Sequence, residues 1–145
     1  MRYLEIMLLA MLPLTELRGA IPIGIAMDLN PIAVYVASVI GSTIVSIPLI
    51  LTFRHILNFF RSVDMFLPLV KKVDSKIETG MKRLKSISIL GIILFVGIPL
   101  PTTGTWTAAA IVSILKIRIK TSLLGVLIGN MMSGIIISLI SLHII

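Results

Sequence analysis

The sequence contains no cysteine and only two histidines, His55 and His143, which lie far apart in the chain. The lack of thiols excludes disulfide bonds, thiolate metal sites and cysteine nucleophiles, and two isolated imidazoles do not form a recognisable zinc site. No other side chains resemble a nucleophile with its base. We therefore expect no metal, no other cofactor and no enzymatic activity.

Acidic residues are also scarce: six Asp and Glu stand against 13 Lys and Arg, which gives a net charge of +7. Nearly all of the cations lie in two short stretches, residues 54–85 and 116–120, between apolar segments. They do not form a basic surface of the size that a nucleic acid needs. We expect anionic lipid headgroups as their partner, and no nucleic acid.

Apolar residues, by contrast, make up 57% of the 145 residues, and the mean hydropathy is +1.13. This is far above what the core of a soluble domain of this length requires. Residues 31–53 and 119–142 are each apolar over roughly the 20 positions that a helix needs to cross a bilayer. The sequence therefore predicts an all-α integral membrane protein with one transmembrane helix in each of these segments.

Two further apolar segments, residues 3–29 and 86–115, are each interrupted by a run that contains proline, threonine and glycine. Proline removes a backbone donor and clashes with the preceding helical turn, so neither segment is expected to be one continuous helix. We predict a re-entrant hairpin in each, with two half-helices of roughly 12 residues and about 18 Å that reach past the middle of the bilayer. The expected hairpin breaks are Pro13, Gly19, Pro22, Pro99, Pro101 and Gly104.

The two halves of the chain resemble one another after a shift of 88 residues, the separation of Pro13 and Pro101. Each half then consists of a hairpin and one spanning helix, within residues 1–53 and 86–145. Such a unit crosses the membrane once, so the second unit must enter from the opposite face. The sequence therefore predicts an inverted-topology repeat.

The linker at residues 54–85 carries eight lysines and arginines, with apolar residues at helical spacing between them. This pattern predicts two amphipathic interfacial helices, and a solvated connector is the alternative. A hairpin at residues 86–115 places the linker and residues 116–120 on one face of the membrane. The positive-inside rule makes that face cytoplasmic, with both termini outside.

Small residues four positions apart predict close helix contacts. They are Ala37 and Gly41 in the first spanning helix, and Gly125, Gly129 and Ser133 in the second. Such contacts could lie within one chain or between two chains. For so small a unit with two repeats we expect a homodimer.

Irregular backbone at membrane depth is tolerated where it lines a wet cavity or is buried in protein, so two hairpin tips that meet near the midplane imply a pathway. Thr15 and Thr103 stand where the returning half-helices begin. We expect their hydroxyls to be N-caps beside free N–H groups that attract anions. Arg18 adds a positive charge in a planar fork suited to phosphate or carboxylate. It is the first candidate for substrate binding.

Glu16 is the only acidic residue within the expected hairpin breaks. A charged carboxylate in hydrocarbon needs a partner or a proton. Glu16 therefore either forms a permanent pair with Arg18 or takes up protons and couples transport to a proton gradient. A direct pair requires irregular backbone, because residues two apart do not face each other on a helix.

The remaining candidates for substrate binding are Thr102, Thr103, Thr105, Trp106 and Asn130. Thr102, Thr105 and Thr107 could surround a headgroup, or could only satisfy backbone groups that the prolines leave free. Trp106 stands at the position that matches Arg18, and could line the same cavity or serve as a core or interfacial anchor. Asn130 could contact substrate or form an interhelical hydrogen bond.

At ELRGAIP (residues 16–22) and PLPTTGTW (residues 99–106) the sequence resembles the small multidrug export protein family. That family looks like a minimal relative of the DedA, or VTT-domain, superfamily, and the resemblance covers essentially the whole chain. It implies paired re-entrant hairpins in a prokaryotic cell membrane. By analogy with DedA-like proteins, it also implies movement of polyprenyl-phosphate carriers or phospholipids between leaflets. Glu16 matches the acidic residue of the first DedA-like hairpin, whereas the arginines of the second have no counterpart here.

Three functional hypotheses follow from these residues and this resemblance. The first is a transporter of an anionic lipid or lipid carrier, with Arg18 on the headgroup and Glu16 as proton-linked counter-ion. The second is a small multidrug or cation exporter, in which Glu16 binds the cation beside Trp106. The third is a membrane scaffold without transport activity.

Overall fold

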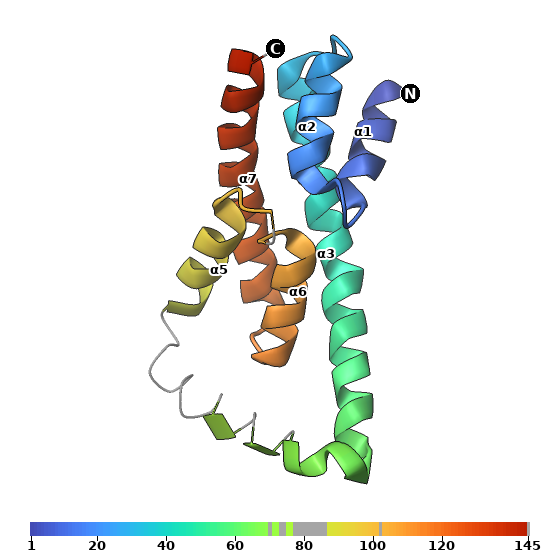
Figure 1. Ribbon diagram of the computed structural model, residues 1–145, viewed down its shortest axis with the longest axis vertical. Coiled ribbons are helices and arrows are strands. Elements are labelled where there is room, and N and C mark those ends of the chain that lie inside the picture. Colours follow the sequence, from blue (N-terminus) through green and yellow to red (C-terminus); the bar gives the residue numbers. More distant parts are fainter. Residues whose placement is uncertain (70, 73–74, 77–86, 102, 145) are drawn as a thin grey trace.

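The computed structural model describes the chain except for residues 70, 73–74, 77–86, 102 and 145. Within these described residues every regular element is helical, which confirms the prediction of an all-α protein. The elements are α1 (Arg2–Met11), α2 (Glu16–Ala26), α3 (Pro31–Ser62), the 3₁₀ turn η1 (Asp64–Phe66), α5 (Ile87–Gly97), α6 (Thr105–Ile114) and α7 (Ile119–Ile144). The molecule is elongated, and both chain ends lie at the same end of it (Figure 1).

Helices α3 and α7 are both long and apolar enough to cross a membrane, as predicted. Asn30 starts α3, because its side-chain oxygen accepts hydrogen bonds from the N–H groups of Ile32 at 3.0 Å and Ala33 at 3.3 Å. Pro31 follows at the first helical position, where its missing N–H has no cost. These local signals fix the point at which α3 leaves the preceding loop.

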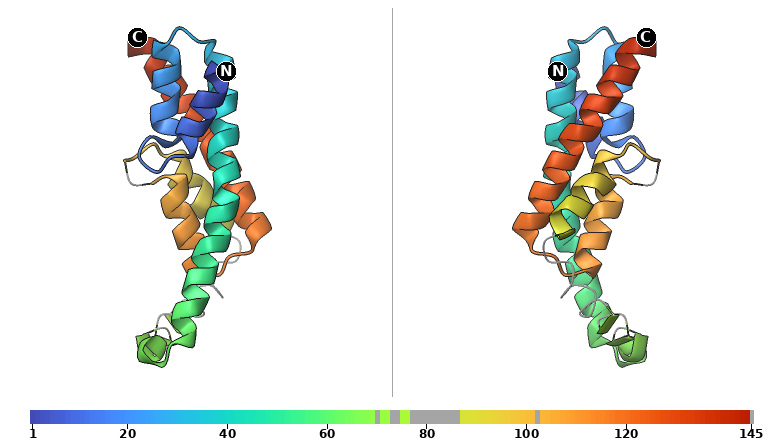
Figure 2. Two further views of the ribbon diagram at one scale, coloured as in Figure 1. Left: turned by 90° about the vertical axis from the view of Figure 1, so that its right-hand side faces the viewer. Right: turned by 90° about the vertical axis from the view of Figure 1, so that its left-hand side faces the viewer.

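The prediction that the first long helix ends at Phe53 is wrong, because α3 continues to Ser62. Residues 54–62 contain neither proline nor glycine, so nothing in the local sequence stops the helix. At about 1.5 Å per residue α3 is about 48 Å long, more than a hydrocarbon core of about 30 Å. Its C-terminal end projects beyond the other helices (Figure 2). The first predicted interfacial helix is thus largely a continuation of α3. In the second, residues 67–69, 71–72 and 75–76 are helical, and residues 70, 73–74 and 77–85 lie outside the described residues.

Helices α1, α2, α5 and α6 form two helical hairpins whose turns face each other near the middle of the molecule (Figure 1). Helix α1 runs inward from the end that holds the termini, and α2 returns to that end. Helices α5 and α6 repeat this course from the opposite end. The two turns, residues 12–15 and 98–104, therefore meet although they are far apart in sequence.

Proline sets both hairpin turns. Leu12 is extended, with φ −74° and ψ 144°, because the ring of Pro13 disfavours helical backbone in the residue before it. Helix α5 ends shortly before Pro99. Gly19 and Pro22, which we expected among the breaks, lie inside α2, which continues to Ala26. One missing N–H does not end a helix that packs against α1, α3 and α7.

The two halves of the molecule pack alike. Helix α1 lies on α3 just as α5 lies on α7, and each pair contributes to a separate apolar cluster. Gly41 of α3 faces the backbone of Met7 in α1, and a Cβ added at Gly129 of α7 would lie 2.7 Å from the Cβ of Val96 in α5. Small residues thus allow these helices to approach closely. These contacts lie within the chain, so the glycines no longer argue for a homodimer, which stays a prediction.

Helices α2 and α6 end in the same turn, with the two hydrogen bonds of a Schellman motif. The bonds are Asp28 N to Ile25 O (3.0 Å) and Leu29 N to Gly24 O (3.2 Å) after α2, and Lys116 N to Ser113 O (3.3 Å) and Ile117 N to Val112 O (3.1 Å) after α6. Asp28 and Lys116 both have left-handed backbone, with φ of 57° and 54°. All four pairs of equivalent residues are 88 positions apart, the shift that aligns the two halves.

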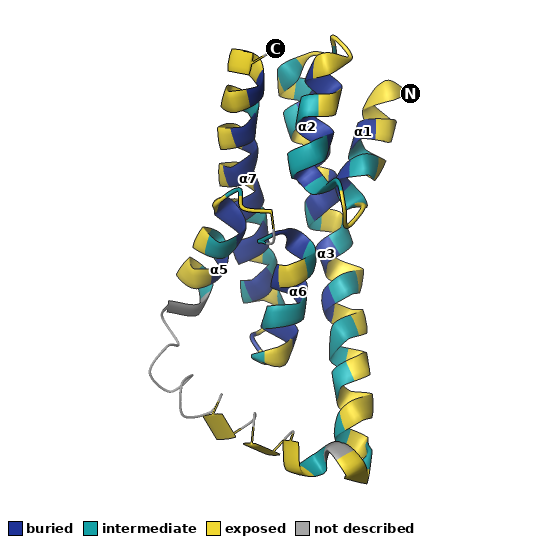
Figure 3. Ribbon diagram, viewed as in Figure 1, coloured by how far each residue is buried: buried dark blue, intermediate teal, exposed yellow. Residues whose placement is uncertain are grey.

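The polarity of α3 is the reverse of that in a soluble helix. Its exposed residues include Ile32, Val36, Ile40 and Ile44, and its buried residues include Ser38, Ser42 and Ser46. Figure 3 shows the same division along the molecule, with exposed strips on the outer faces of α3 and α7. In water this arrangement would be unfavourable, since large apolar residues prefer the interior. In hydrocarbon it is favourable, because the outer face needs no water and the inner face can form hydrogen bonds.

Candidate functional site

A cavity of about 320 Å³ lies between the two hairpin turns. Its lining residues are Pro13, Leu14, Thr15, Glu16, Arg18 and Gly19 from the first hairpin, and Pro101, Gly104, Trp106 and Thr107 from the second. Glu16 and Arg18 are the only charged residues among the described ones that line it. The cavity therefore combines one carboxylate, one guanidinium and several apolar groups.

Arg18 lies in the first turns of α2 and reaches across to the end of α5. Its Nη1 donates to Leu100 O (2.7 Å), and its Nη2 donates to Thr103 O (2.7 Å), Thr103 Oγ1 (3.1 Å), Val96 O (3.3 Å) and Ile98 O (3.3 Å). Carbonyl groups at the end of a helix have no intrahelical partner and carry partial negative charge. The guanidinium therefore caps the C-terminal end of α5.

Glu16 lies beside the opposite kind of helix end, the N-terminus of α6. Its Oε1 accepts a hydrogen bond from Trp106 N at 3.3 Å. Gly104, the N-cap residue of α6, lies so close that an added Cβ would overlap the carboxylate. N–H groups at a helix start carry partial positive charge, which stabilises a carboxylate placed there. Glu16 thus caps α6 from the other hairpin.

Glu16 and Arg18 also form a loose ion pair, with Arg18 Nη1 at 3.8 Å from Glu16 Oε2. The backbone of Glu16 has a φ of 45°, in the left-handed region. This irregularity lets two residues that are two positions apart converge, which a regular helix would prevent. The two charges of the first hairpin thus face the two oppositely polarised helix ends of the second.

Thr15 is the N-cap residue of α2, as predicted, but the prediction that the hydroxyls of Thr15 and Thr103 cap the returning helices is wrong. Thr15 Oγ1 donates to Leu9 O at 2.5 Å, and Thr103 Oγ1 donates to Ile98 O at 2.8 Å. Both hydroxyls turn back towards the end of the preceding helix, where they donate to carbonyl groups that have left the regular helical hydrogen-bond pattern. At the start of α6 the carboxylate of Glu16 takes the place that a hydroxyl cap would have had.

Trp106 makes a third connection between the hairpins. Its indole Nε1 donates to Met11 O, the last residue of α1, at 3.2 Å. Its side chain lines the same cavity as Arg18. An indole placed in this way presents both an apolar surface and a fixed donor.

Thr105 and Asn130 do not line the cavity. They belong to a buried polar cluster between α3, α6 and α7. Its hydrogen bonds run from Thr105 Oγ1 to Asn130 Oδ1 (3.1 Å), between Ser42 Oγ and Thr105 Oγ1 (3.0 Å), and from Asn130 Nδ2 to Thr43 Oγ1 (3.3 Å). Asn130 therefore forms the interhelical hydrogen bonds that we considered as the alternative to substrate contact.

Some of the other predicted site residues lie outside the cavity or outside the described residues. Pro99 and Pro22 do not line the cavity, and Thr102 lies outside the described residues. Sequence analysis missed Leu14, which lines the cavity, and Ser42, which bonds to the buried cluster. The repeat offered a signal for the second, because Ser42 stands at the position equivalent to Asn130. In the described part of the chain, no three histidine or acidic side chains gather as a metal site would require.

Comparison with known proteins adds one family. Residues 16–136 match the model of a family described as "Putative small multi-drug export protein". The match begins at Glu16, directly after the first hairpin turn, and covers α2, α3, the second hairpin and most of α7. No curated protein and no solved structure matches the chain.

Proposed function

The chain belongs to the small multi-drug export protein family, and on this premise we propose that it exports amphipathic organic cations through the cavity between its hairpin turns. Of the hypotheses raised by the sequence, cation export agrees with the description of the family better than lipid transport does. The proposal assigns cation binding to Glu16, with Trp106 as the aromatic wall.

The observation that carries this proposal is the difference between the two charged groups. Arg18 uses its two terminal nitrogens on five acceptors of the second hairpin, two of them at 2.7 Å. An anionic headgroup would have to displace these acceptors. Glu16 is held by a long hydrogen bond of 3.3 Å from Trp106 N, by the neighbouring N–H of Thr105 and by an ion pair of 3.8 Å. A carboxylate with such loose contacts can accept a cation at small cost.

The size and lining of the cavity also suit an organic cation. A volume of about 320 Å³ lies at the lower end of the range of about 300–1,000 Å³ in which small molecules bind. Trp106 is the best aromatic partner for a cation, and Pro13 and Leu14 supply apolar surface. One carboxylate in apolar surroundings is the minimum that a lipophilic cation needs.

Proton coupling follows from the same carboxylate. Glu16 can hold a cation or a proton, but a protonated carboxyl group has no charge with which to retain the cation. Binding of a proton on one side of the membrane would therefore release the cation there. This exchange needs no group beyond Glu16, which is the role that we assign to it.

For the pathway we propose two re-entrant hairpins in an inverted-topology repeat. Helices α1 and α5 have 10 and 11 residues, or about 15 Å, which is half of a hydrocarbon core of about 30 Å. The identical turns after α2 and α6 support the repeat. Irregular backbone at this depth needs a protein or water surrounding, which the cavity provides. The linker and residues 116–120 are then cytoplasmic, and both termini lie outside.

Movement of an anionic lipid or polyprenyl phosphate is the second candidate, in keeping with the DedA-like resemblance. The observation in its favour is that Arg18 lines the cavity as well as binding the carbonyl groups. This function requires Arg18 to leave some of these acceptors during transport. A membrane scaffold is the third candidate, and it requires neither charge to act on a substrate.

The test is transport by the purified full-length chain in liposomes. Uptake of ethidium is measured under an imposed pH gradient, and leaflet exchange of a fluorescent phosphatidylglycerol is measured in parallel. We expect ethidium transport by the wild type and its loss in Glu16→Gln. The matched control is Glu5→Gln, which removes the exposed acidic residue of α1 far from the cavity.

Each outcome separates the candidates. Ethidium transport that survives Glu16→Gln contradicts the assigned role of Glu16. Lipid exchange without ethidium transport, lost in Arg18→Lys, would favour the second candidate. If neither probe moves in the wild type, the scaffold remains. Unchanged thermal unfolding of Glu16→Gln in detergent excludes misfolding as the cause of lost transport.

A further inference from the structure

A second cavity, of about 220 Å³, lies at the other end of the second hairpin. It is formed by the projecting part of α3 and by the end of α6 with the loop that follows. Its lining residues are Arg54, Leu57, Asn58, Arg61, Ser113 and Lys116. It shares no residue with the cavity between the hairpin turns.

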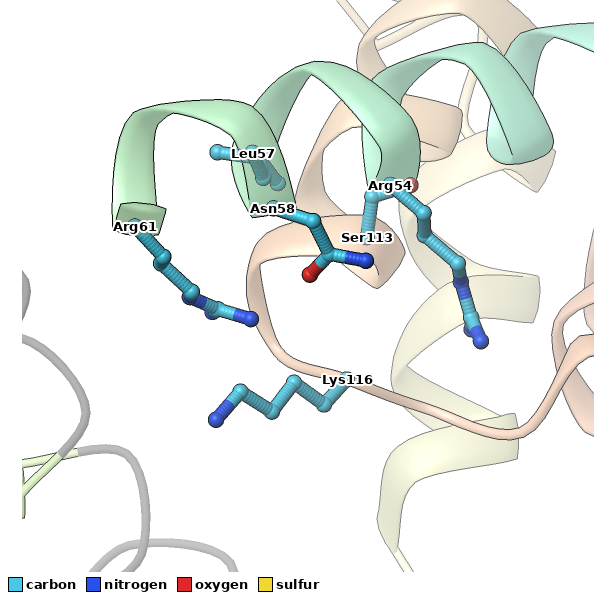
Figure 4. Close-up of a pocket in the computed structure, with 6 residues that line it drawn as sticks. All are labelled: Arg54, Leu57, Asn58, Arg61, Ser113 and Lys116. Atoms are coloured by element: carbon cyan, nitrogen blue, oxygen red, sulfur yellow. The ribbon is translucent and has the colours of Figure 1, made fainter. Parts of the chain in front are cut away.

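Cationic side chains from two distant segments line this cavity: Arg54 and Arg61 of α3, and Lys116 after α6. Arg54, Asn58 and Arg61 are three or four positions apart and so share one face of α3. Figure 4 shows the side chains of Arg61 and Lys116 extending into the same space below Asn58. The Schellman turn after α6 holds Lys116 in left-handed backbone. None of the described residues that line the cavity is acidic.

The guanidinium of Arg54 is only partly hydrogen-bonded within the described residues. Its Nη2 donates to Ile117 O in the loop that follows α6. Its Nε is buried and donates to no acceptor among the described residues. A buried guanidinium N–H without an acceptor is costly, and the positive charge of Arg54 at the margin of the cavity favours an anion nearby.

We propose that this cavity binds a phosphate group. Guanidinium forks suit phosphate oxygens, a lysine adds a point charge, and an asparagine amide adds a neutral donor. Three cations around one cavity also raise the local concentration of anions. The volume is smaller than the range of about 300 Å³ and more that organic ligands usually fill. A phosphate group, and not a drug-sized molecule, is therefore the ligand.

The phosphate group can come from a lipid headgroup or from a soluble phosphate compound. Phe59 and Phe60, on the same projecting part of α3, are 65% and 43% exposed. Exposed phenylalanine rings beside basic residues are typical of helices at the membrane–water interface, where lipid phosphates lie. The same pocket could also take inorganic phosphate or a phosphomonoester from solution. The experiment distinguishes these two sources.

The experiment uses the full chain in nanodiscs. In the first arm, inorganic phosphate is titrated into discs of phosphatidylcholine at constant ionic strength, and binding is followed by calorimetry. In the second arm, the midpoint of thermal unfolding is compared between discs of phosphatidylglycerol and discs of phosphatidylcholine. The test variant is the double substitution Arg61→Gln with Lys116→Gln. The matched control is Lys71→Gln with Lys72→Gln, which removes the same charge from two exposed lysines outside the cavity.

We expect the test variant to weaken phosphate binding at least about tenfold, since it loses two charge-assisted contacts. The control variant should retain wild-type affinity, and exchange to Arg61→Lys with Lys116→Arg should restore most of it. Stabilisation by phosphatidylglycerol alone, lost in the test variant, supports the site with a lipid as source. Binding of inorganic phosphate supports it with a soluble source.

Two results would overturn the proposal. One is that neither inorganic phosphate nor phosphatidylglycerol has an effect on the wild type. The other is that the test and control variants lose the effect equally, which would mean general attraction to a basic surface. If the double variant does not fold, Asn58→Asp makes the same test, because it places a negative charge in the cavity and must weaken binding.

Discussion

The two hairpin turns occupy equivalent positions in the two halves of the chain, yet they carry different chemistry. The first contributes charged side chains, Glu16 and Arg18, and the second contributes backbone N–H and C=O groups at the broken ends of α5 and α6. At the positions that match Glu16 and Arg18, the second turn has Gly104 and Trp106. The difference between the two turns is what lets them fit each other. Where one presents a carboxylate, the other must leave room for it, and only glycine does so.

Removal of the guanidinium should have the largest effect on this contact. In Arg18→Met the carbonyl groups of Val96, Ile98, Leu100 and Thr103 lose their shared donor, and Glu16 loses its counter-charge. Loss of these hydrogen bonds and of the counter-charge of Glu16, in a partly buried site, should lower the free energy of unfolding by about 3–5 kcal/mol. Thermal unfolding in detergent measures the change.

Arg18→Lys is the control that keeps the positive charge but removes the planar guanidinium group. It keeps the positive charge but cannot reach several carbonyl groups at once. We expect its free energy of unfolding to lie between those of the wild type and Arg18→Met. Equal stability of all three proteins would mean that the guanidinium does not hold the two turns together.

Filling the space at Gly104 should have a smaller effect that depends on Glu16. In Gly104→Ala the new methyl group displaces the carboxylate from Trp106 N, at a cost of about 1–3 kcal/mol. In the background of Glu16→Ala the same substitution should cost little, because nothing remains to be displaced. A double-mutant cycle on thermal unfolding should therefore give a coupling of at least about 1 kcal/mol. Additive effects would show that the two residues do not compete for this space.

The buried polar cluster joins the halves by a different route, through α3, α6 and α7. Thr105→Val keeps the shape of the side chain but leaves Ser42 and Asn130 without their common partner. We expect a loss of about 1–2 kcal/mol in unfolding free energy. Thr107→Val, on the exposed face of α6, is the matched control and should be neutral. An equal loss in both variants would assign the effect to the helix and not to the cluster.

The smallest expected effect is a gain at the turn that both halves share. Asp28 has left-handed backbone, which strains a residue with a side chain. Asp28→Gly should therefore raise the free energy of unfolding by about 0.5–1 kcal/mol, and Asp28→Ala should not. If the alanine variant is as stable as the glycine variant, the carboxylate and not the backbone limits stability at this turn.

Sequence reasoning succeeded where the determining physics is local. Apolar runs of sufficient length predicted both long helices, and proline predicted where the hairpins turn. It failed where a local signal was weaker than tertiary packing. Pro22 and Gly19 do not break α2, because α2 packs against neighbouring helices. The polar and charged residues after Phe53 do not end α3, because no proline or glycine interrupts the helix there. The hydroxyls of Thr15 and Thr103 donate to carbonyl groups of the preceding helix. The position of these carbonyl groups depends on the conformation of the whole turn.

By itself, the sequence determined that this chain is helical, that it is apolar enough for a membrane, and that two proline-rich turns interrupt it. It also placed one carboxylate and one guanidinium in the first turn. Only the tertiary structure decided that these charges face the helix ends of the other hairpin, that Trp106 shares their cavity, and that Thr105 and Asn130 do not. The physical reason is that helix ends acquire their partial charges wherever a helix stops, but their partners come from whichever segment packs against them.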